Sequence, residues 1–355
     1  SNSRDCIDCL SLNECELCVE TVRSDRCHNS KFLLDCKECV DSSFLFDCVN
    51  CQNCFLSSNL RNKSFVIENQ QYSKEEYAKK IQEYKIDTID GLEETKNKFE
   101  NLISNSLHKF ARIVKSVNST GDNIRNVKNA KSCFDMFDIE DTRYSMRGWN
   151  VKNSYDLFGV DDTEGDYESV NNGYFSSHIE FSTNTHTNCL YVQYTDYCRS
   201  SSYLFGCVSM RNKKYCILNK QYSENEFNEL KEKITAHMNQ VPYQDKQGRI
   251  YKYGEFFPPE ISPFGFNETV AYDFLTLSKT EAESMGYRWR ARESRSYQIT
   301  IQPQDLPKSI ADTTDSALGE VIGCEHGGKC DEDCTTAFKI IPDELRLYRR
   351  MNYLL

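Results

Sequence analysis

Long apolar runs, a basic surplus and glycine-rich loops are all missing from this sequence. No stretch approaches the roughly 18 apolar residues that a membrane-spanning helix needs, and residues 1–12 lack the basic and apolar segments of a signal peptide. The formal net charge of −11 leaves no broad basic face for nucleic acid. No glycine-rich phosphate-binding motif is present. We therefore expect a cytoplasmic protein that has no membrane segment and that binds a protein or another macromolecular partner, with nucleic acid disfavoured.

Proline and glycine are also scarce, with 7 and 15 residues among 355, whereas Phe and Tyr number 20 and 21. A disordered chain would not carry so many aromatic residues, so we expect this one to fold. Cysteine is abundant, with 18 residues. Because no secretion signal is seen, we expect reduced thiols or metal ligands in preference to disulfides.

The cysteines recur in a register. A set of four reappears 21 residues later: Cys6, Cys15, Cys18 and Cys27 are followed by Cys27, Cys36, Cys39 and Cys48. Short apolar patches accompany them, and such short repeats must stack on their neighbours to bury an apolar face. The sequence therefore predicts a mainly β fold: a duplicated, short-turn β-solenoid with coils of about 21 residues, helical caps and a small α/β C-terminal module.

A larger duplication contains this register. Residues 61–73 (RNKSFVIENQQYS) match residues 211–223 (RNKKYCILNKQYS) at 8 of 13 positions, with an offset of 150. The same offset carries Cys39 onto Cys189 without a gap. The chain therefore contains two copies of one design.

Each copy leads into a helix through a capping box. Ser73 with Glu76, and Ser223 with Glu226, have the spacing at which the serine oxygen accepts a first-turn amide and the glutamate reaches back to the cap. Helices are expected directly after them, over about 74–84 and 224–239.

Further elements follow from local patterns. We expect a helix over 92–114, a helix from the capping box of Ser278 and Glu281 to Gly286, a strand over Tyr297–Ile301 and a helix that begins at Pro342. The predicted organisation has six segments: a cysteine-rich solenoid (1–73), a helical cap and connecting helix (74–117), a second solenoid (118–223), a second helical cap (224–240), an aromatic and proline-rich strap with a small α/β segment (241–320), and a zinc-binding module with a terminal helix (321–355).

The C-terminal segment contains the best candidate metal site. Its proposed ligands are thiols and one imidazole on a glycine-containing loop: Cys324, His326, Cys330 and Cys334. Zinc takes three or four such ligands in tetrahedral geometry. The alternative is a set of unligated or oxidised thiols.

C-x-x-C pairs fill the N-terminal copy, namely Cys6/Cys9, Cys15/Cys18, Cys36/Cys39, Cys48/Cys51 and Cys51/Cys54. Three interpretations compete: an interior ladder of small buried residues, zinc sites, or disulfides. The second copy spaces its cysteines by nine residues and has no C-x-x-C pair: Cys189, Cys198, Cys207 and Cys216. Local metal knuckles therefore do not explain the cysteines in general, and the ladder is the favoured interpretation.

Two charged runs and three histidines are weaker candidates. The acidic run at 161–166 has the residue types for calcium or for paired carboxylates, although such a run is more often a solvated loop. The basic run at 288–295 is more often a solvated face than a nucleic-acid site. His28, His178 and His186 are more often structural than catalytic.

Three stretches carry a resemblance to a family of uncharacterised proteins of candidate-phylum bacteria known from metagenomes. They are RNKKYCILNKQYS at 211–223, GEFFPPEISPFGFNETVAYDF at 254–274 and AFKIIPDELRLYRRMNYLL at 337–355. The resemblance implies a bacterial, cytoplasmic origin. It also implies a C-terminal zinc ribbon that involves some of Cys324, Cys330 and Cys334, completed in relatives by a further cysteine pair. It implies no activity.

These observations favour a non-catalytic binding or scaffold protein with a metal-stabilised C-terminal module. One alternative is a carbohydrate-active β-solenoid enzyme that uses Asp161, Asp162 or Glu164 in a cleft, by analogy of fold only. Another is a nucleic-acid-associated zinc protein that uses the C-terminal module and the basic run.

Overall fold

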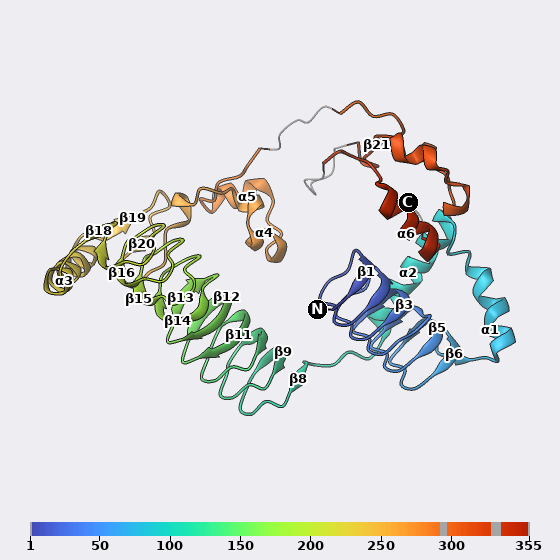
Figure 1. Cartoon of the computed structure of the whole chain (residues 1–355), viewed down its shortest axis with the longest axis horizontal. Coiled ribbons are helices and arrows are strands. Elements are labelled where there is room, and N and C mark those ends of the chain that lie inside the picture. The colour runs from blue at the N-terminus through green and yellow to red at the C-terminus, as the bar shows by residue number, and fades with distance from the viewer. Residues whose placement is uncertain (1, 292–296, 328–334, 354–355) are drawn as a thin grey trace. The chain divides into compact units, whose positions relative to one another are not determined.

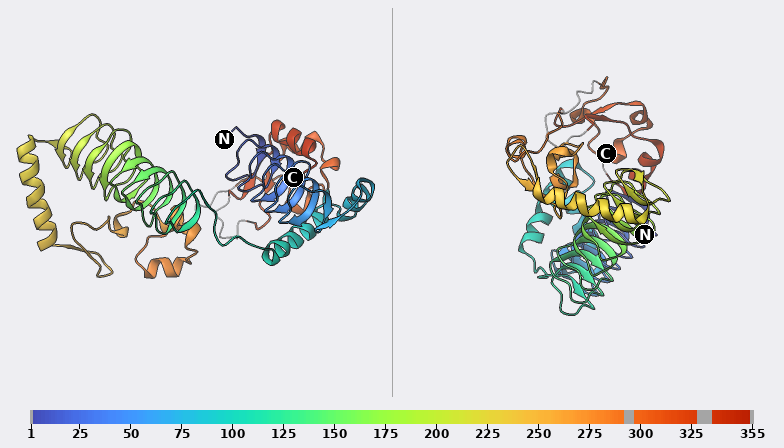
Figure 2. Two further views of the ribbon diagram at one scale, coloured as in Figure 1. Left: turned by 90° about the horizontal axis from the view of Figure 1, so that it is seen from below. Right: turned by 90° about the vertical axis from the view of Figure 1, so that its left-hand side faces the viewer.

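The structure is a computed structural model that describes residues 2–291, 297–327 and 335–353. The chain divides into two compact units: unit 1 combines Ser1–His108 with Arg292–Leu355, and unit 2 is Lys109–Ala291. Each unit contains one stack of strands that pair in sequence order (Figure 1). Figure 2 shows the successive turns of the chain in each stack from two further directions. The prediction of a mainly β fold built from repeated strands is confirmed.

The stack of unit 1 has seven strands: β1 (Arg4–Ile7), β2 (Glu16–Val19), β3 (His28–Leu34), β4 (Ser43–Phe46), β5 (Gln52–Ser58), β6 (Ser64–Ile67) and β7 (Gln70–Gln71). Strands β1 to β6 are parallel. Strand β7 pairs antiparallel with β6 and ends the sheet.

The stack of unit 2 has eleven strands: β8 (Ile113–Val114), β9 (Gly121–Arg125), β10 (Cys133–Phe137), β11 (Met146–Lys152), β12 (Tyr155–Glu164), β13 (Tyr167–Val170), β14 (Gly173–Glu180), β15 (Leu190–Gln193), β16 (Ser202–Phe205), β17 (Lys214–Ile217) and β18 (Lys220–Gln221). It also ends in an antiparallel pair, β17 with β18. The two copies seen in the sequence therefore have the same strand plan at their C-terminal ends.

The structural repeat is 12 residues long. Parallel pairing joins Arg4 with Glu16, and an isolated bridge joins Leu10 with Val22. Unit 2 keeps this offset except for a step of 11 between β8 and β9 and steps of 13 at β14. The predicted coil of about 21 residues is therefore wrong. Both 12 and 21 are multiples of three, so the cysteine spacing alone does not distinguish them.

A three-residue unit underlies the repeat. Every third residue from Cys15 to Ser57 is buried, with at most 3% of its surface exposed. The residue before each of them has a positive φ, and many of these positions are Asn or Asp, which tolerate that conformation better than other residues with a side chain. A period of three matches neither the strand period of 2 nor the helix period of 3.6. Ordinary amphipathic patterns therefore do not reveal it.

The inward positions explain the cysteines. Each inward Cys or Ser from Cys15 to Ser57 donates to the carbonyl two residues before it, as Cys18 Sγ does to Glu16 O at 3.5 Å and Ser30 Oγ does to His28 O at 2.9 Å. The core is narrow, so a small side chain that also satisfies a backbone carbonyl suits it. The cysteines that the structure describes are free thiols, and those between Cys15 and Cys54 form one buried cluster. The interpretation as an interior ladder is confirmed.

Helices cover the C-terminal end of each stack. Helix α1 (Lys74–Lys80) and helix α3 (Glu224–Gln240) begin at the two predicted capping boxes. Tyr77 on α1 and Phe227 on α3 are buried in apolar clusters with side chains of the last strands. The end strands therefore do not expose their apolar face at these ends.

The connecting helix is shorter than predicted. Helix α2 (Ile89–Asn105) packs on the stack of its own unit, where the ring centroids of Phe99 and Phe44 lie 5.6 Å apart. It ends nine residues before the predicted boundary at 114. The remaining apolar residues of the pattern are not on the helix, because Ile113 belongs to β8 and Phe110 is fully exposed. An apolar spacing that fits a helix does not show where the helix ends.

The part of the predicted strap that belongs to unit 2, up to Ala291, packs on the stack, whereas the rest of the predicted segment 241–320 belongs to unit 1. It contains β19 (Tyr243–Gln244), β20 (Ile250–Tyr251), α4 (Val270–Phe274) and α5 (Lys279–Ser284). The Tyr253 hydroxyl accepts a 2.9 Å bond from Gln193 Nε2, and the Gly254 amide donates at 2.9 Å to the Tyr194 hydroxyl. Helix α5 starts at its capping box and ends just before Gly286, as predicted.

The C-terminal part of unit 1 contains β21 (Ile322–Gly323), β22 (Ala337–Phe338) and α6 (Pro342–Met351), with α6 beginning at Pro342 as predicted. The predicted strand at 297–301 is wrong, since only Ile301 forms a bridge, with Ile322. Short 3-10 helices complete the fold: Ile81–Tyr84, Pro259–Ile261, Phe266–Glu268, Pro303–Asp305, Ile310–Asp312 and Asp315–Gly319. None of the helices in the described ranges is long and apolar enough to span a bilayer.

Candidate binding groove

One row of side chains runs along the stack of unit 2, with one residue from each repeat. Its first four members, which we call the amide row, are Asn118, Asn129, Asp141 and Asn153. After Gly165 come four rings, which we call the aromatic row: His178, Tyr191, Tyr203 and Tyr215. All nine positions have positive φ. The side chain at each position points outward, and the next residue in the sequence points inward.

The amide row is held by hydrogen bonds from one repeat to the next. Asn118 Nδ2 donates to Asn129 Oδ1 and Asn129 Nδ2 donates to Asp141 Oδ1, each at 3.1 Å. Asn153 Nδ2 donates to Glu164 Oε1 at 2.8 Å. The row is therefore preorganised, and each amide keeps unused donor and acceptor capacity.

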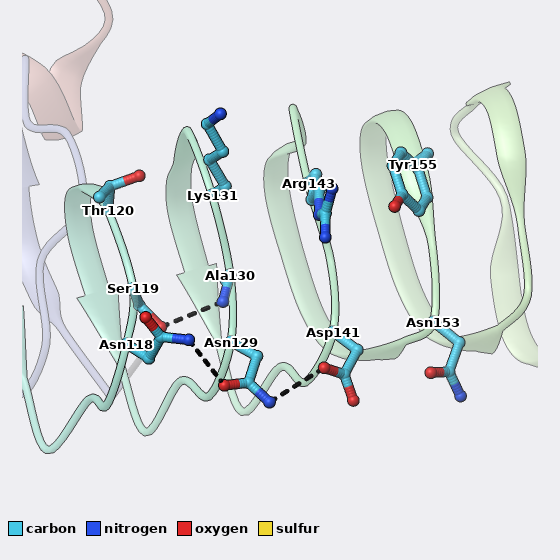
Figure 3. Close-up of a pocket in the computed structure, with 10 residues that line it drawn as sticks. All are labelled: Asn118, Ser119, Thr120, Asn129, Ala130, Lys131, Asp141, Arg143, Asn153 and Tyr155. Carbon is cyan, nitrogen blue, oxygen red and sulfur yellow. Dashed lines mark hydrogen bonds between the residues drawn. The ribbon is translucent and has the colours of Figure 1, made fainter.

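A second row lies opposite the amide row (Figure 3). We call it the cation row: Thr120, Lys131, Arg143 and Tyr155. The two rows border a groove of about 1100 Å³, which Ser119 and Ala130 also line. Groove residues on both rows are exposed.

The cation row places two positive charges side by side. Lys131 and Arg143 are joined by an isolated parallel bridge, on adjacent repeats. Within the described part of the chain, neither has an ion pair, although Arg143 Cζ lies 5.4 Å from the ring centroid of Tyr155. Some in-register cations of these stacks meet a carboxylate, as Arg23 meets Asp35 at 2.7 Å, whereas Arg199 and Arg211 form a second in-register cation pair outside the groove. Like charges on facing positions repel, so an anion in the groove would relieve this repulsion.

The aromatic row is built differently. Its rings stack on one another, with centroid distances of 4.5 Å for His178 and Tyr191, 5.3 Å for Tyr191 and Tyr203, and 5.0 Å for Tyr203 and Tyr215. Because neighbouring rings already cover these faces, the row offers ring edges and hydroxyls to a ligand. We assign it a mainly structural role.

The acidic run forms part of a strand and the turn after it. Asp162 in β12 accepts a 2.7 Å hydrogen bond from Asn150 Nδ2. Burial raises the pKa of Asp161. Asp166 points into the core, only 1% exposed, and accepts hydrogen bonds from Thr163 Oγ1 and the Ile179 amide. The run therefore distributes its carboxylates between the surface and the core.

Burial raises the pKa of Asp166 to about 7, and the hydrogen bonds from the Ile179 amide and Thr163 oppose this shift only in part. The surrounding core is polar, with buried Ser169 and Asn172 in the neighbouring inward positions. This is the region where the repeat lengthens from 12 to 13 residues.

The C-terminal candidate is described in part. Cys324 is half-buried and His326 is exposed, while Cys330 and Cys334 lie outside the described residues. The Gly327 amide donates to Cys324 O at 2.9 Å, which forms a tight turn around the first two proposed ligands. Across residues 2–291, 297–327 and 335–353 no group of three or more metal-binding side chains is present.

The basic run contacts the strap where it is described. Arg288 Nη1 donates to Ser262 O at 2.8 Å, and Arg290 forms an ion pair with Glu268. The residues from Arg292 to Ser296 lie outside the described ranges.

Burial and the nearby Arg199 lower the pKa of His186, which favours its neutral form.

Sequence reasoning missed the groove residues. The signal was present, because Asn129, Asp141 and Asn153 follow one another at 12-residue steps. A search with a period of 12 would have aligned them, and would have aligned Lys131, Arg143 and Tyr155 as well. The assumed period of 21 places them on unrelated positions.

No protein-family model and no curated protein matches this sequence. Among solved structures, a protein from Desulfovibrio desulfuricans G20 assigned as an acetyltransferase matches with 11% identity and a TM-score of 0.13, over 69% of this chain. This chain spans 63% of the length of that protein. The UDP-N-acetylglucosamine O-acyltransferase of Moraxella catarrhalis RH4 matches with 13% identity and a TM-score of 0.12, over 70% of this chain and 88% of the other. Scores this low support no argument about fold or function.

Proposed function

We propose that this protein is a non-catalytic binding protein in which each strand stack is a β-solenoid and the groove of unit 2 holds an extended ligand. The observation that carries the proposal is the pair of in-register rows on the two sides of the groove. Repeating polar groups on a rigid scaffold suit a ligand that itself repeats. The alternative of a carbohydrate-active enzyme has less support, because Asp162 is engaged by Asn150 and Asp166 is buried.

A groove-filling substitution tests the binding function. We expect the full chain to bind at least one class of molecule on an array of glycans, peptides and oligonucleotides. The Asn129→Trp variant should not bind that class. Asn126→Trp is the matched control, since Asn126 also has positive φ and donates to a carboxylate 12 residues on, but does not line the groove. Mass spectrometry of the recovered ligand should show no chemical change. The proposal would be contradicted if the full chain binds none of these classes, or if it converts a ligand chemically and a groove substitution abolishes that turnover.

The proposal includes a zinc ion that stabilises the C-terminal segment, with Cys324, His326, Cys330 and Cys334 as ligands. The turn at Gly327 and the thiol and imidazole beside it support the first half of this ligand set. A reducing compartment, the cytoplasm, is also part of the proposal, because the described cysteines are free thiols.

Elemental analysis with a thiol count tests the zinc site. We expect about one zinc per chain, loss of that zinc in Cys324→Ser, and retention in Cys39→Ser. The control removes an interior thiol from the ladder, where serine already occupies equivalent positions such as Ser30. Unfolded, metal-free protein should have all 18 thiols free. Absence of zinc, or equal zinc loss in both variants, would overturn the proposed zinc site. A low count of free thiols would overturn the proposed reducing compartment.

A further inference from the structure

We propose that the ligand of the groove is a linear acidic polysaccharide, a polymer of sugar rings that carry carboxylates. This inference rests on the proposed binding function and adds the chemical class of the ligand. It is carried by the spacing of the two rows, the unpaired cations of one row and the amides of the other.

The spacing of the rows argues against two other linear polymers. Adjacent strands lie about 4.8 Å apart, so each row presents a group at that interval. An extended peptide advances by about 3.3 Å per residue, and stacked nucleotides by about 3.4 Å. Neither stays in step with the rows over several repeats. A sugar ring with its glycosidic linkage is longer than both and close to the strand interval.

The cations select the charge of the ligand. Arg143 has a planar guanidinium that matches a carboxylate through two hydrogen bonds, and Lys131 adds a point charge one repeat away. Asp141 on the opposite row disfavours a ligand that is anionic along both sides. A uronate ring fits this arrangement, because its carboxylate faces the cations while a hydroxyl on the other side donates to Asp141.

The amide row suits sugar hydroxyls. An asparagine amide has two donors and two acceptor sites. The hydrogen bonds along the amide row use one N–H of Asn129 and one acceptor site on its oxygen. The free positions can bond neighbouring hydroxyls of one ring. Tyr155, with 37% of its surface exposed, offers its ring edge and hydroxyl at the end of the cation row. The contacts that hold the strap involve Gln193 and Tyr194, which do not line the groove.

Calorimetric titration of the full chain with oligogalacturonate tests this inference. The matched ligand is the methyl-esterified oligogalacturonate, which has the same rings without the charge, and a sulfated glycan distinguishes carboxylate from sulfate recognition. We expect measurable binding of the free acid that weakens with added salt, and at least about tenfold weaker binding of the ester and of the sulfated glycan.

A pair of charge substitutions locates the binding. Lys131→Gln with Arg143→Gln should weaken binding at least about tenfold. The matched control is Arg199→Gln with Arg211→Gln, which removes another in-register cation pair that does not line the groove, and it should leave the affinity within about twofold. Thermal unfolding of both double variants checks that the fold is kept.

The outcomes separate this inference from the proposed function. Equal binding of acid and ester, tighter binding of the sulfated glycan, or equal weakening by both double variants would overturn the acidic-polysaccharide assignment. If the array instead identifies a peptide or an oligonucleotide whose binding Asn129→Trp abolishes, the binding function stands and this assignment fails. If no ligand class binds, both fail.

Discussion

Replacing Asp166 with asparagine should stabilise unit 2 at pH 8 and reduce the fall in its stability between pH 5 and pH 8. Asp166 is 1% exposed and its pKa is raised to about 7 by burial, with a smaller contribution from the charge of Glu180. An asparagine keeps the oxygen that accepts from the Ile179 amide. Its new N–H can bond the Thr163 hydroxyl, which can still donate to Ser176 O, 3.1 Å away.

The sign of the change in the free energy of unfolding with pH follows from proton binding by Asp166. Asp166 has an ordinary pKa of 3.8 when unfolded and about 7 when folded. Between these values the folded state holds a proton that the unfolded state has released, so the free energy of unfolding falls as pH rises. The loss amounts to about 4 kcal/mol and is complete above pH 7. At pH 8 the wild-type chain must bury a charge, whereas the Asp166→Asn chain does not.

Urea unfolding followed by hydrogen exchange of unit 2 peptides, at pH 5 and pH 8, measures this effect. The control is Asp156→Asn, which neutralises an exposed carboxylate of the same strand, β12, and should change the pH dependence much less than Asp166→Asn does. Equal stability changes at the two pH values for Asp166→Asn would contradict the assignment of a buried, protonated carboxyl.

Replacing Phe44 with alanine should destabilise unit 1 by about 3 to 5 kcal/mol, the usual cost of removing a buried aromatic ring. Phe44 is completely buried in β4. Its ring stacks on Phe32 at 4.3 Å and makes edge contacts with Phe55 at 5.5 Å and with Phe99 of α2 at 5.6 Å. The substitution therefore removes contacts both within the stack and between the stack and its helix.

The control for this variant is Phe175→Ala. Phe175 is also a strand residue with positive φ, 61° against 58° for Phe44, but 74% of its surface is exposed. The backbone cost of alanine at positive φ is therefore shared, and the difference reports burial. Urea unfolding should show a change of no more than about 0.5 kcal/mol for the control. A loss for Phe44→Ala no larger than that of the control would show that the helix does not depend on this contact.

Local signals predicted several elements correctly because the interactions behind them are local. The capping boxes at Ser73, Ser223 and Ser278 involve residues three positions apart, and all three form. The helix predicted over 92–114 ended early, because Ile113 pairs with Ile124 in β9, a long-range contact that outweighs its fit to a helical stripe. The predicted 21-residue coil failed for a related reason, since the offset is set by pairing between repeats.

The candidate site shows the same division. Thiols of the C-terminal segment stand out in the sequence because their spacing is short, and that site stays a prediction. The groove has no local motif: Asn129 and Asp141, or Lys131 and Arg143, become neighbours only when the chain pairs with itself 12 residues on. Single residues of these types elsewhere in a sequence are ordinary surface positions.

The sequence by itself determined that the chain is duplicated, that its cysteines form a repeating set, and that helices begin at the capping boxes, because each of these depends on residue identity and short spacing. Only the tertiary structure decided the length of the repeat, the direction of each side chain and the burial of Asp166. These depend on which residues meet across strands, and the hydrogen bonds and packing between repeats select one offset among several that the cysteine spacing allows.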